Sequence, residues 1–319
     1  MRASTLHKLT AAHAEGIWCA TWIPGTSQLL TGSVDEYVKL WDLSGAEAPA
    51  GPLHSFTGHS LGAVALATDA TGTLAACSAL DSLVRVWEPA SGDTRFSIEA
   101  APTETWGVAF GPVTDEAARL AVAGGSREIV ALHRGGSADE REPEAKLALP
   151  PAADGPAGGA GRERFVLAVA FSPDFRLVAG SAMDGTVALW DAATGQLLHS
   201  LKGHHRPVRS LAFTPDGKLL LTACDDCHAN LYDTHSGGLV DSFSGHESWV
   251  LNVAVHPGGA AFATSSSDAK VRLWDLATRS CVQTLGEHTD QVWALGFSGD
   301  GTRLASAGDD KLVTVYSVA

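Results

Sequence analysis

Short apolar runs recur along the whole chain and are separated by compact polar turns. Residues 17–22 (IWCATW) and 208–213 (VRSLAF) are typical runs. Turn sequences include SPDF at 172–175, TPDGK at 214–218, HPGG at 256–259 and SGDG at 298–301. Runs of this length, bounded by Gly, Pro and Asp, predict short strands joined by tight turns. The 34 glycines among 319 residues agree with this, so we expect an all-β chain.

The same pattern returns at a fixed interval. In six units an Asp stands six residues before an aromatic residue, at Asp35/Trp41, Asp81/Trp87, Asp184/Trp190, Asp226/Tyr232, Asp268/Trp274 and Asp310/Tyr316. In five of these units a His lies 22 residues before the Asp, at His13, His59, His204, His246 and His288. Chance does not keep such an offset five times, and self-similarity at a fixed period is the signature of a repeat architecture.

Two further segments complete or interrupt the pattern. A seventh, degenerate unit joins WGVAFGP (106–112) to SREIVAL (126–132), and the fourth unit carries Arg162 where other units have His. Between these two units, residues 134–164 are rich in Pro, Gly, Ala and charge. This composition predicts a disordered surface insertion around one short strand near AKLAL (145–149). The alternative is a docking loop.

These repeats resemble the WD40 family, whose period is about 40–45 residues. The resemblance implies one domain over residues 1–319, a seven-bladed β-propeller of four-stranded blades. It also implies that His, Asp and Trp form a hydrogen-bonded structural cluster in each blade. The residues at these positions are His13, Asp35, Trp41, His59, Asp81, Trp87, Asp184, Trp190, His204, Asp226, His246, Asp268, Trp274, His288 and Asp310.

The last unit has no residues left for its outer strand, since the chain ends at Ala319, directly after the third strand. Residues 4–10 (STLHKLT) are well placed to supply that strand. Such pairing would close the ring and remove an exposed sheet edge.

Net charge, apolar runs and cysteine content indicate which partners and which cellular compartment to expect. The net charge of −14 makes direct binding to nucleic acid or to an anionic membrane surface unlikely on electrostatic grounds. No apolar run is long enough to span a bilayer, and the first residues lack the pattern of a secretory signal. Five scattered cysteines indicate reduced thiols. We therefore expect a protein of the cytoplasm and nucleus.

The segment CDDCH at 224–228 resembles a haem-attachment or metal-binding motif. Asp226, however, already holds the turn position of its repeat, and a structural zinc site needs four ligands. No nucleophile elbow, phosphate-binding loop or His-Glu-x-x-His motif occurs in the sequence. We expect no enzyme activity, no metal and no cofactor. A metalloprotein built on Cys224 and His228 is the rival interpretation.

Four of the nine tryptophans are not explained by the repeat. In WD40 propellers, the residues three and five places after the repeat His, and the one before the turn Asp, lie on the top face around the channel mouth. Exposed apolar patches mark interaction sites, and Trp is enriched at binding hot spots. The alternative is that the indoles only plug the channel. The resulting candidates for partner binding are Trp18, Glu104, Trp106, Phe165, Leu167, Arg209, Asp225, Trp249, Leu251, Trp293 and Asp309.

Several strings, among them GHESWVLNVAVHP (245–257) and EHTDQVWALGF (287–297), resemble the small WD-repeat subunits of the superkiller (Ski) complex. Such subunits also occur in the RNA-polymerase-II-associated factor (PAF) complex. The resemblance implies a monomeric, non-catalytic scaffold within hetero-complexes. Its expected partners are the tetratricopeptide-repeat protein and RNA helicase of the Ski complex, which acts in 3′–5′ mRNA decay, and the PAF subunits, which act in transcription elongation.

The same resemblance implies a top face that grips short peptides containing a basic and a hydrophobic residue. Glu104, Asp225 and Asp309 are the candidates for the basic side chain. The indoles and Phe165 are the candidates for apolar contact. The alternative is a WD40 scaffold of a different assembly, such as a motility or signalling complex.

Overall fold

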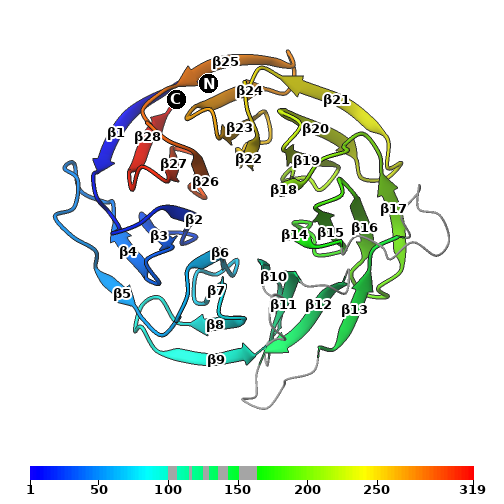
Figure 1. Ribbon diagram of the computed structural model, residues 1–319, viewed down its shortest axis with the longest axis horizontal. Coiled ribbons are helices and arrows are strands. Elements are labelled where there is room, and N and C mark those ends of the chain that lie inside the picture. The colour runs from blue at the N-terminus through cyan, green and yellow to red at the C-terminus, as the bar shows by residue number, and fades with distance from the viewer. Residues whose placement is uncertain (100–105, 115–116, 125–128, 136–142, 151–163) are drawn as a thin grey trace.

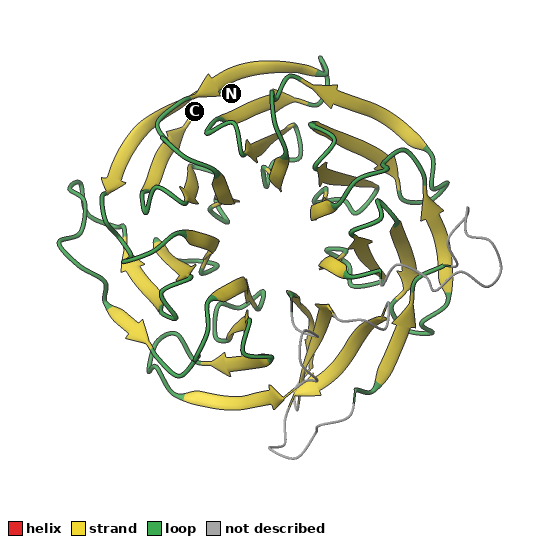
Figure 2. Ribbon diagram, viewed as in Figure 1, coloured by secondary structure: helices red, strands yellow, loops and turns green. Residues whose placement is uncertain are grey.

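The computed structural model describes residues 1–99, 106–114, 117–124, 129–135, 143–150 and 164–319. Within these residues, 28 strands form seven antiparallel sheets of four strands each. The sheets stand around a central axis like the blades of a propeller (Figure 1). All the described secondary structure is strand, with turns and loops between (Figure 2). The expected all-β, seven-bladed fold is confirmed.

Blades 1 to 6 each take four consecutive strands, from the inside of the ring to the outside. Blades 1 to 3 consist of β2 (Ile17–Trp22), β3 (Gln28–Ser33), β4 (Val38–Asp42) and β5 (His54–Phe56); β6 (Ala63–Thr68), β7 (Ala75–Ala79), β8 (Leu83–Trp87) and β9 (Thr94–Glu99); and β10 (Gly107–Thr114), β11 (Ala117–Gly124), β12 (Ile129–Gly135) and β13 (Ala145–Ala148). The short strand expected near AKLAL is therefore β13.

Blades 4 to 6 follow the same order. They consist of β14 (Val166–Phe171), β15 (Leu177–Ala182), β16 (Val187–Asp191) and β17 (Leu197–Leu201); β18 (Val208–Phe213), β19 (Leu219–Cys224), β20 (His228–Asp233) and β21 (Leu239–Ser244); and β22 (Val250–Val255), β23 (Ala261–Ser266), β24 (Val271–Asp275) and β25 (Ser280–Leu285). Blade 7 consists of β26 (Val292–Phe297), β27 (Arg303–Gly308), β28 (Val313–Val318) and β1 (Ala3–Leu9).

Strand β1 closes the ring as expected, with bounds one residue earlier than the predicted 4–10. It pairs antiparallel with β28 from Ala3↔Val318 to Leu9↔Val313. The side-chain amide of Gln283 in blade 6 also bonds both the backbone N–H and the C=O of Ala3, each at 2.8 Å. The two ends of the chain therefore belong to one sheet.

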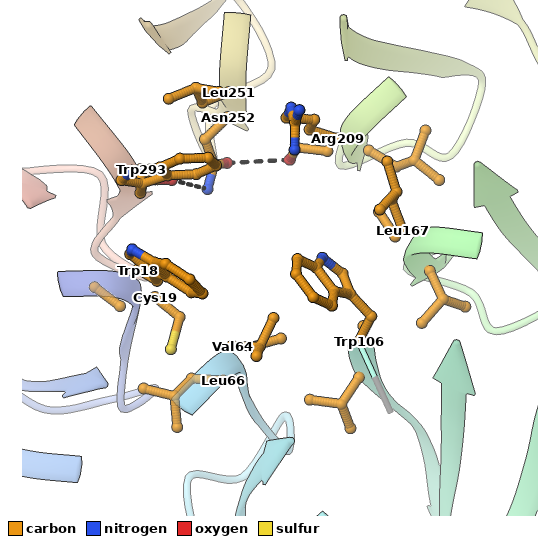
Figure 3. A pocket seen from close by; sticks show the side chains of 18 residues that line it. Trp18, Cys19, Val64, Leu66, Trp106, Leu167, Arg209, Leu251, Asn252 and Trp293 are labelled. Carbon is orange, nitrogen blue, oxygen red and sulfur yellow. Dashed lines mark hydrogen bonds between the residues drawn. The ribbon is translucent and has the colours of Figure 1, made fainter. Parts of the chain in front are cut away.

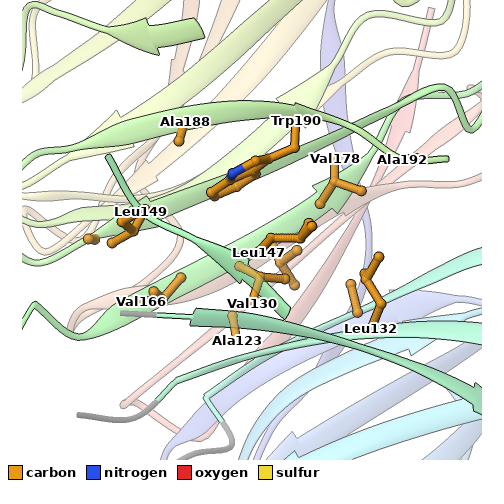
Figure 4. Close-up of a cluster of buried hydrophobic side chains, with 13 residues drawn as sticks. Ala123, Val130, Leu132, Leu147, Leu149, Val166, Val178, Ala188, Trp190 and Ala192 are labelled. Atoms are coloured by element: carbon orange, nitrogen blue, oxygen red, sulfur yellow. The ribbon is translucent and has the colours of Figure 1, made fainter. Parts of the chain in front are cut away.

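The core lies between neighbouring blades. Where blades 3 and 4 meet, Trp190 packs with residues of both sheets, including Val130 and Leu147 (Figure 4). The Trp190 Nε1–H donates to the backbone oxygen of Ala148 in β13, at 3.2 Å. Each blade thus buries one sheet face against the next, which is why the repeat is stable only as a closed array.

The repeat cluster includes a hydroxyl that the sequence pattern did not reveal. In blade 1, His13 Nδ1 lies 3.0 Å from Asp35, while Nε2 lies 2.8 Å from the Thr31 hydroxyl, which also accepts from Trp41 Nε1 at 2.9 Å. Trp therefore joins the cluster through Thr, not through the carboxylate. Blade 6 repeats the arrangement with His246, Asp268, Thr264 and Trp274.

Electrostatics follow from this geometry. Burial disfavours the charged form of both partners, and it lowers the pKa of His13. In blade 6 burial opposes ionisation of Asp268, but hydrogen bonds from His246 and from two backbone N–H groups outweigh it and lower the carboxyl pKa to about 2. The Asp268 carboxylate is thus ionised, and it accepts the Nδ1–H of the His246 imidazole.

Blades 5 and 7 keep the His, the Asp and the hydroxyl but have Tyr in place of Trp. His204 Nε2 lies 2.7 Å from the Thr222 hydroxyl, and His288 Nε2 lies 2.7 Å from the Ser306 hydroxyl. Nδ1 of His204 lies 2.6 Å from Asp226 Oδ2, and Nδ1 of His288 lies 2.9 Å from Asp310 Oδ2.

In blade 4, Arg162 was expected at the position of the repeat His, but it lies outside the described residues. Arg164, two positions later, bonds Asp184 at 2.5 Å, Thr186 at 2.8 Å and the backbone oxygen of Pro150 at 2.6 Å. In blade 3, His133 pairs with Leu120, just as Trp41 pairs with Leu29 in blade 1. The degenerate unit therefore fills the Trp position with an imidazole.

Blade 2 has a thiol at the hydroxyl position. Ala75 pairs with Trp87 as Leu29 pairs with Trp41 in blade 1. Cys77 follows Ala75 by two residues, just as Thr31 follows Leu29, so Cys77 holds the position of Thr31. His59 still holds Asp81, at 3.2 Å, and burial lowers the His59 pKa. Among the described residues, however, neither His59 Nε2 nor Trp87 Nε1 has a hydrogen-bond partner. A thiol is too weak an acceptor and donor to replace the hydroxyl.

We therefore expect Cys77→Thr to raise the free energy of unfolding by about 1–2 kcal/mol, because it satisfies two buried nitrogens. Denaturant unfolding monitored by circular dichroism measures the change. Cys77→Val is the matched control, since it has nearly the same shape as Thr without the hydroxyl. A gain of equal size in Cys77→Val would assign the effect to packing and contradict the hydrogen-bond explanation.

The described residues include no helix that is both long and apolar enough to span a membrane.

Candidate functional site

In six of the seven blades, a β-bulge directs one side chain toward the mouth of the central channel. The innermost strand of six blades shifts register around a single residue, the position five after the repeat His. A bulge leaves one residue outside the ladder and redirects its side chain. The bulged residues are Trp18, Val64, Leu167, Arg209, Leu251 and Trp293.

These six residues and Trp106 of blade 3 line one cavity of about 310 Å³. Figure 3 shows Trp18 and Trp293 on one side of it and Trp106, Leu167 and Arg209 on the other. Leu167 and Leu251 are buried and form its wall, so they are not exposed rim residues. The cavity is the size of a few side chains and has both apolar and polar lining, which suits a short extended segment of another protein.

Asp309 is a carboxylate bonded to two of the tryptophans that line the cavity. It accepts from Trp293 Nε1 at 2.9 Å and from Trp18 Nε1 at 3.3 Å, and the two indole rings lie 5.8 Å apart. A Cβ added at Gly16 would lie 2.4 Å from an Asp309 oxygen, so the glycine makes room for this carboxylate. Within the described part of the chain, no Lys, Arg or His forms a recorded ion pair with Asp309.

Asp225 was expected to be open to a basic side chain of a partner, but it is already paired within the chain. Arg209 binds both of its carboxylate oxygens, at 2.6 and 2.7 Å, and the Asp225 side chain is only 5% exposed. The guanidinium also lies 5.4 Å from the Trp249 ring and 5.7 Å from the Trp293 ring. The charge of Asp225 is thus balanced by Arg209 of the same blade. Arg209 also contacts the indoles of Trp249 and Trp293, which belong to the next two blades.

The remaining candidates lie around the rim. Trp249 is 43% exposed, which is unusual for an indole and consistent with the idea that the fold needs it little. The Phe165 and Trp106 rings lie nearly perpendicular to each other, with centroids 5.6 Å apart. Glu104 lies outside the described residues. The rim residues Leu80 and Met183 are exposed, as are Leu61 and Tyr37, which the spacing argument did not single out.

A model of the WD domain, G-beta repeat, matches residues 4–42, 50–88, 160–191, 195–233, 237–275 and 279–317, more than half of the chain. The chain belongs to the WD40 repeat family. The expected family is confirmed, and the bulged residues therefore lie at the channel mouth of a WD40 propeller. Degenerate blade 3 falls between the matched segments.

This WD40 chain is similar to two curated proteins. It is 43% identical over 212 residues to the WD repeat-containing protein VIP3 of Arabidopsis thaliana, covering 65% of this chain and 63% of that protein. It is 33% identical over 200 residues to the WD repeat-containing protein SL1-17 of Schistosoma mansoni, covering 61% and 59%. Each match spans less than two thirds of the relative's own length.

One group of side chains in the described WD40 blades has the composition of a metal site. Ligand atoms of His204, Cys224 and Asp226 lie within 4.8 Å of one another. Both nitrogens of His204 are engaged in the blade 5 cluster. Cys224 Sγ lies 3.5 Å from the Asp226 N–H, a bond that Ser33 and Ser266 make at the same position in blades 1 and 6. The trio is therefore the repeat cluster with a thiol in place of a serine.

Proposed function

We propose that this WD40 propeller is a non-catalytic scaffold whose top face binds a partner segment carrying a basic and a hydrophobic side chain. The observation that carries the proposal is Asp309, a partly exposed carboxylate fixed by two indole N–H groups. A partner cation there would gain a charge-assisted hydrogen bond and contact with two aromatic faces. With Asp225 taken by Arg209, Asp309 is the described carboxylate best suited to this role.

The hydrophobic side chain of the partner would enter the cavity of about 310 Å³ beside Asp309. Trp18, Trp106 and Trp293 would contact it from three blades, and Trp249 would cover it from the rim. Aromatic residues that surround a desolvated pocket are typical binding hot spots. The candidate role of the four unexplained tryptophans is therefore partner contact.

We further propose that the partners are those of the Ski and PAF complexes, and that the protein works in the cytoplasm and nucleus. The support is the resemblance of strings such as GHESWVLNVAVHP to the small WD-repeat subunits of these complexes. Affinity purification with mass spectrometry tests this part. Recovery of a tetratricopeptide-repeat protein with an RNA helicase, or of PAF subunits, is expected, whereas recovery of a motility or signalling assembly alone would refute it.

Two substitutions test the top face itself. Asp309→Asn removes the charge but keeps an acceptor for the indoles, and Trp249→Ala removes the exposed ring. Each is expected to weaken partner binding by about 2 kcal/mol, roughly thirtyfold, without a comparable loss of stability. Quantitative pull-down and thermal unfolding measure the two effects.

Val282→Ala is the matched control, because Val282 is 46% exposed on the outer strand β25, away from the channel. Equal partner recovery from the control and the top-face variants would place the binding surface elsewhere.

A further inference from the structure

Arg209 holds a special place in the cavity of about 310 Å³. Of the residues that line this cavity, all of which the structure describes, Arg209 alone carries a charge. Its Nε–H and Nη2–H donate to the two carboxylate oxygens of Asp225, at 2.6 and 2.7 Å, and the two side chains are 20% and 5% exposed. The planar guanidinium fits a carboxylate in one orientation, so this pair holds the arginine side chain in place.

Trp249 depends on this arginine for the orientation of its ring. Its backbone oxygen accepts from the Ser267 N–H at 3.0 Å, which fixes the main chain but not the side chain. Within the described residues, no hydrogen bond from its Nε1 and no ring–ring contact is recorded, whereas the Arg209 guanidinium lies 5.4 Å from the ring centroid. Exposed side chains without a fixed contact exchange between rotamers on a fast timescale. The cation–π contact with Arg209 therefore favours one orientation of this exposed indole.

The same guanidinium connects to the proposed cation site through Trp293. It lies 5.7 Å from the Trp293 ring centroid. Trp293 Nε1–H donates to Asp309 at 2.9 Å, and the Trp293 ring lies 5.8 Å from that of Trp18. A connected set of contacts thus runs from blade 5 through blade 7 to blade 1. Arg209 stands at one end of it, and Asp309 accepts hydrogen bonds from the two indoles at the other.

We propose that Arg209, held by Asp225, is a positioning residue that orders the Trp249 and Trp293 rings before a partner binds. A ring that is already ordered loses less conformational entropy on binding than a mobile ring does, so the partner binds more tightly. The proposal rests on the proposed function of the top face, in which these indoles contact the partner. It assigns Arg209 no bond to the partner, because Asp225 balances the guanidinium charge and the effect passes through the two indoles.

The heteronuclear ¹H–¹⁵N NOE of the Trp249 indole N–H, measured on the free full-length protein, tests the ordering. Trp249→Phe identifies the signal among those of the nine tryptophans. In the wild type we expect an NOE close to that of buried Trp274, and in Arg209→Met a clear decrease for Trp249 alone. Arg206→Met is the matched control, because Arg206 is an exposed arginine three residues before Arg209. An unchanged Trp249 NOE in Arg209→Met would overturn the proposal.

Calorimetric titration with the recombinant tetratricopeptide-repeat protein of the Ski complex tests the consequence for binding. Arg209→Met is expected to weaken binding about two- to tenfold, the effect of ordering one side chain on association. Asp225→Asn should weaken it too, although Asp225 is buried and does not line the cavity, and it should add nothing in the Arg209→Met background. Unchanged affinity in Arg209→Met, or additive losses from the two substitutions, would overturn the proposal. Absence of binding to the wild type would refute the proposed partner instead, because the NOE is measured without a partner and still decides whether Arg209 orders Trp249.

Discussion

Trp274→Ala is expected to lower the free energy of unfolding by about 3–5 kcal/mol. Trp274 is 4% exposed, and its ring stacks on Phe262 with centroids 5.9 Å apart. The Phe243 ring lies at a steep angle to the indole, with centroids 5.6 Å apart. Its Nε1–H donates to the Thr264 hydroxyl at 2.8 Å. The substitution leaves a cavity between blades 5 and 6 and removes one donor from the hydrogen-bonded cluster of His246 and Asp268.

Denaturant unfolding monitored by intrinsic fluorescence or circular dichroism measures this loss. The matched control is Trp249→Ala in the same blade, where the removed ring is largely solvent-facing and the expected loss is about 0.5 kcal/mol or less. A similar loss for both variants would mean that Trp249 also belongs to the core. The comparison separates a tryptophan that holds the blade together from one that is available to a partner.

Removal of residues 1–10 is the second change with a large expected effect, namely loss of a cooperative thermal transition. The truncation deletes β1 and exposes the edge of β28. It also takes Leu9 and Ala3 out of two separate core clusters and leaves the Gln283 amide unpaired at Ala3. The newly exposed edge of β28 can pair with other chains, so aggregation is expected as well.

Size-exclusion chromatography and calorimetry measure both consequences. Lys8→Ala is the control, because it removes only the exposed ion pair with Glu287 and should change stability little. Adding a synthetic peptide of residues 1–12 to the truncated protein should restore the transition. A truncated protein with the melting temperature of the full chain would show that β1 does not close the ring.

The fold was predictable because the repeat signals are redundant. The offset between His and Asp, the turn sequences and the leftover strand at residues 4–10 each point to the same closed ring. The rim positions were predictable for a related reason: a β-bulge at a constant register directs Trp18 and Trp293 to the same place in their blades. Periodicity thus determines which face a residue occupies.

Periodicity does not determine which side chains pair on that face. Asp309 accepts from Trp18, which is 291 positions away, and Arg209 reaches a carboxylate expected to be open. The hydroxyl of Thr31 was missed because Thr is common in strands and carries no distinctive spacing signal. In blade 4 an arginine side chain reaches Asp184 from residue 164, since its length tolerates a displaced backbone position.

Ring closure by β1 sets an order of events during synthesis. Among the described strands, β1 is synthesised first and pairs with β28, which is synthesised last, because Ala3 lies opposite Val318. At about 5–20 residues per second, the two are separated by roughly 15–60 s of translation. Throughout that interval the first ten residues have no place to fold, although blades 1 to 6 have all of their own strands. The nascent β1 segment is therefore accessible to chaperones, proteases and modifying enzymes until β28 has been synthesised.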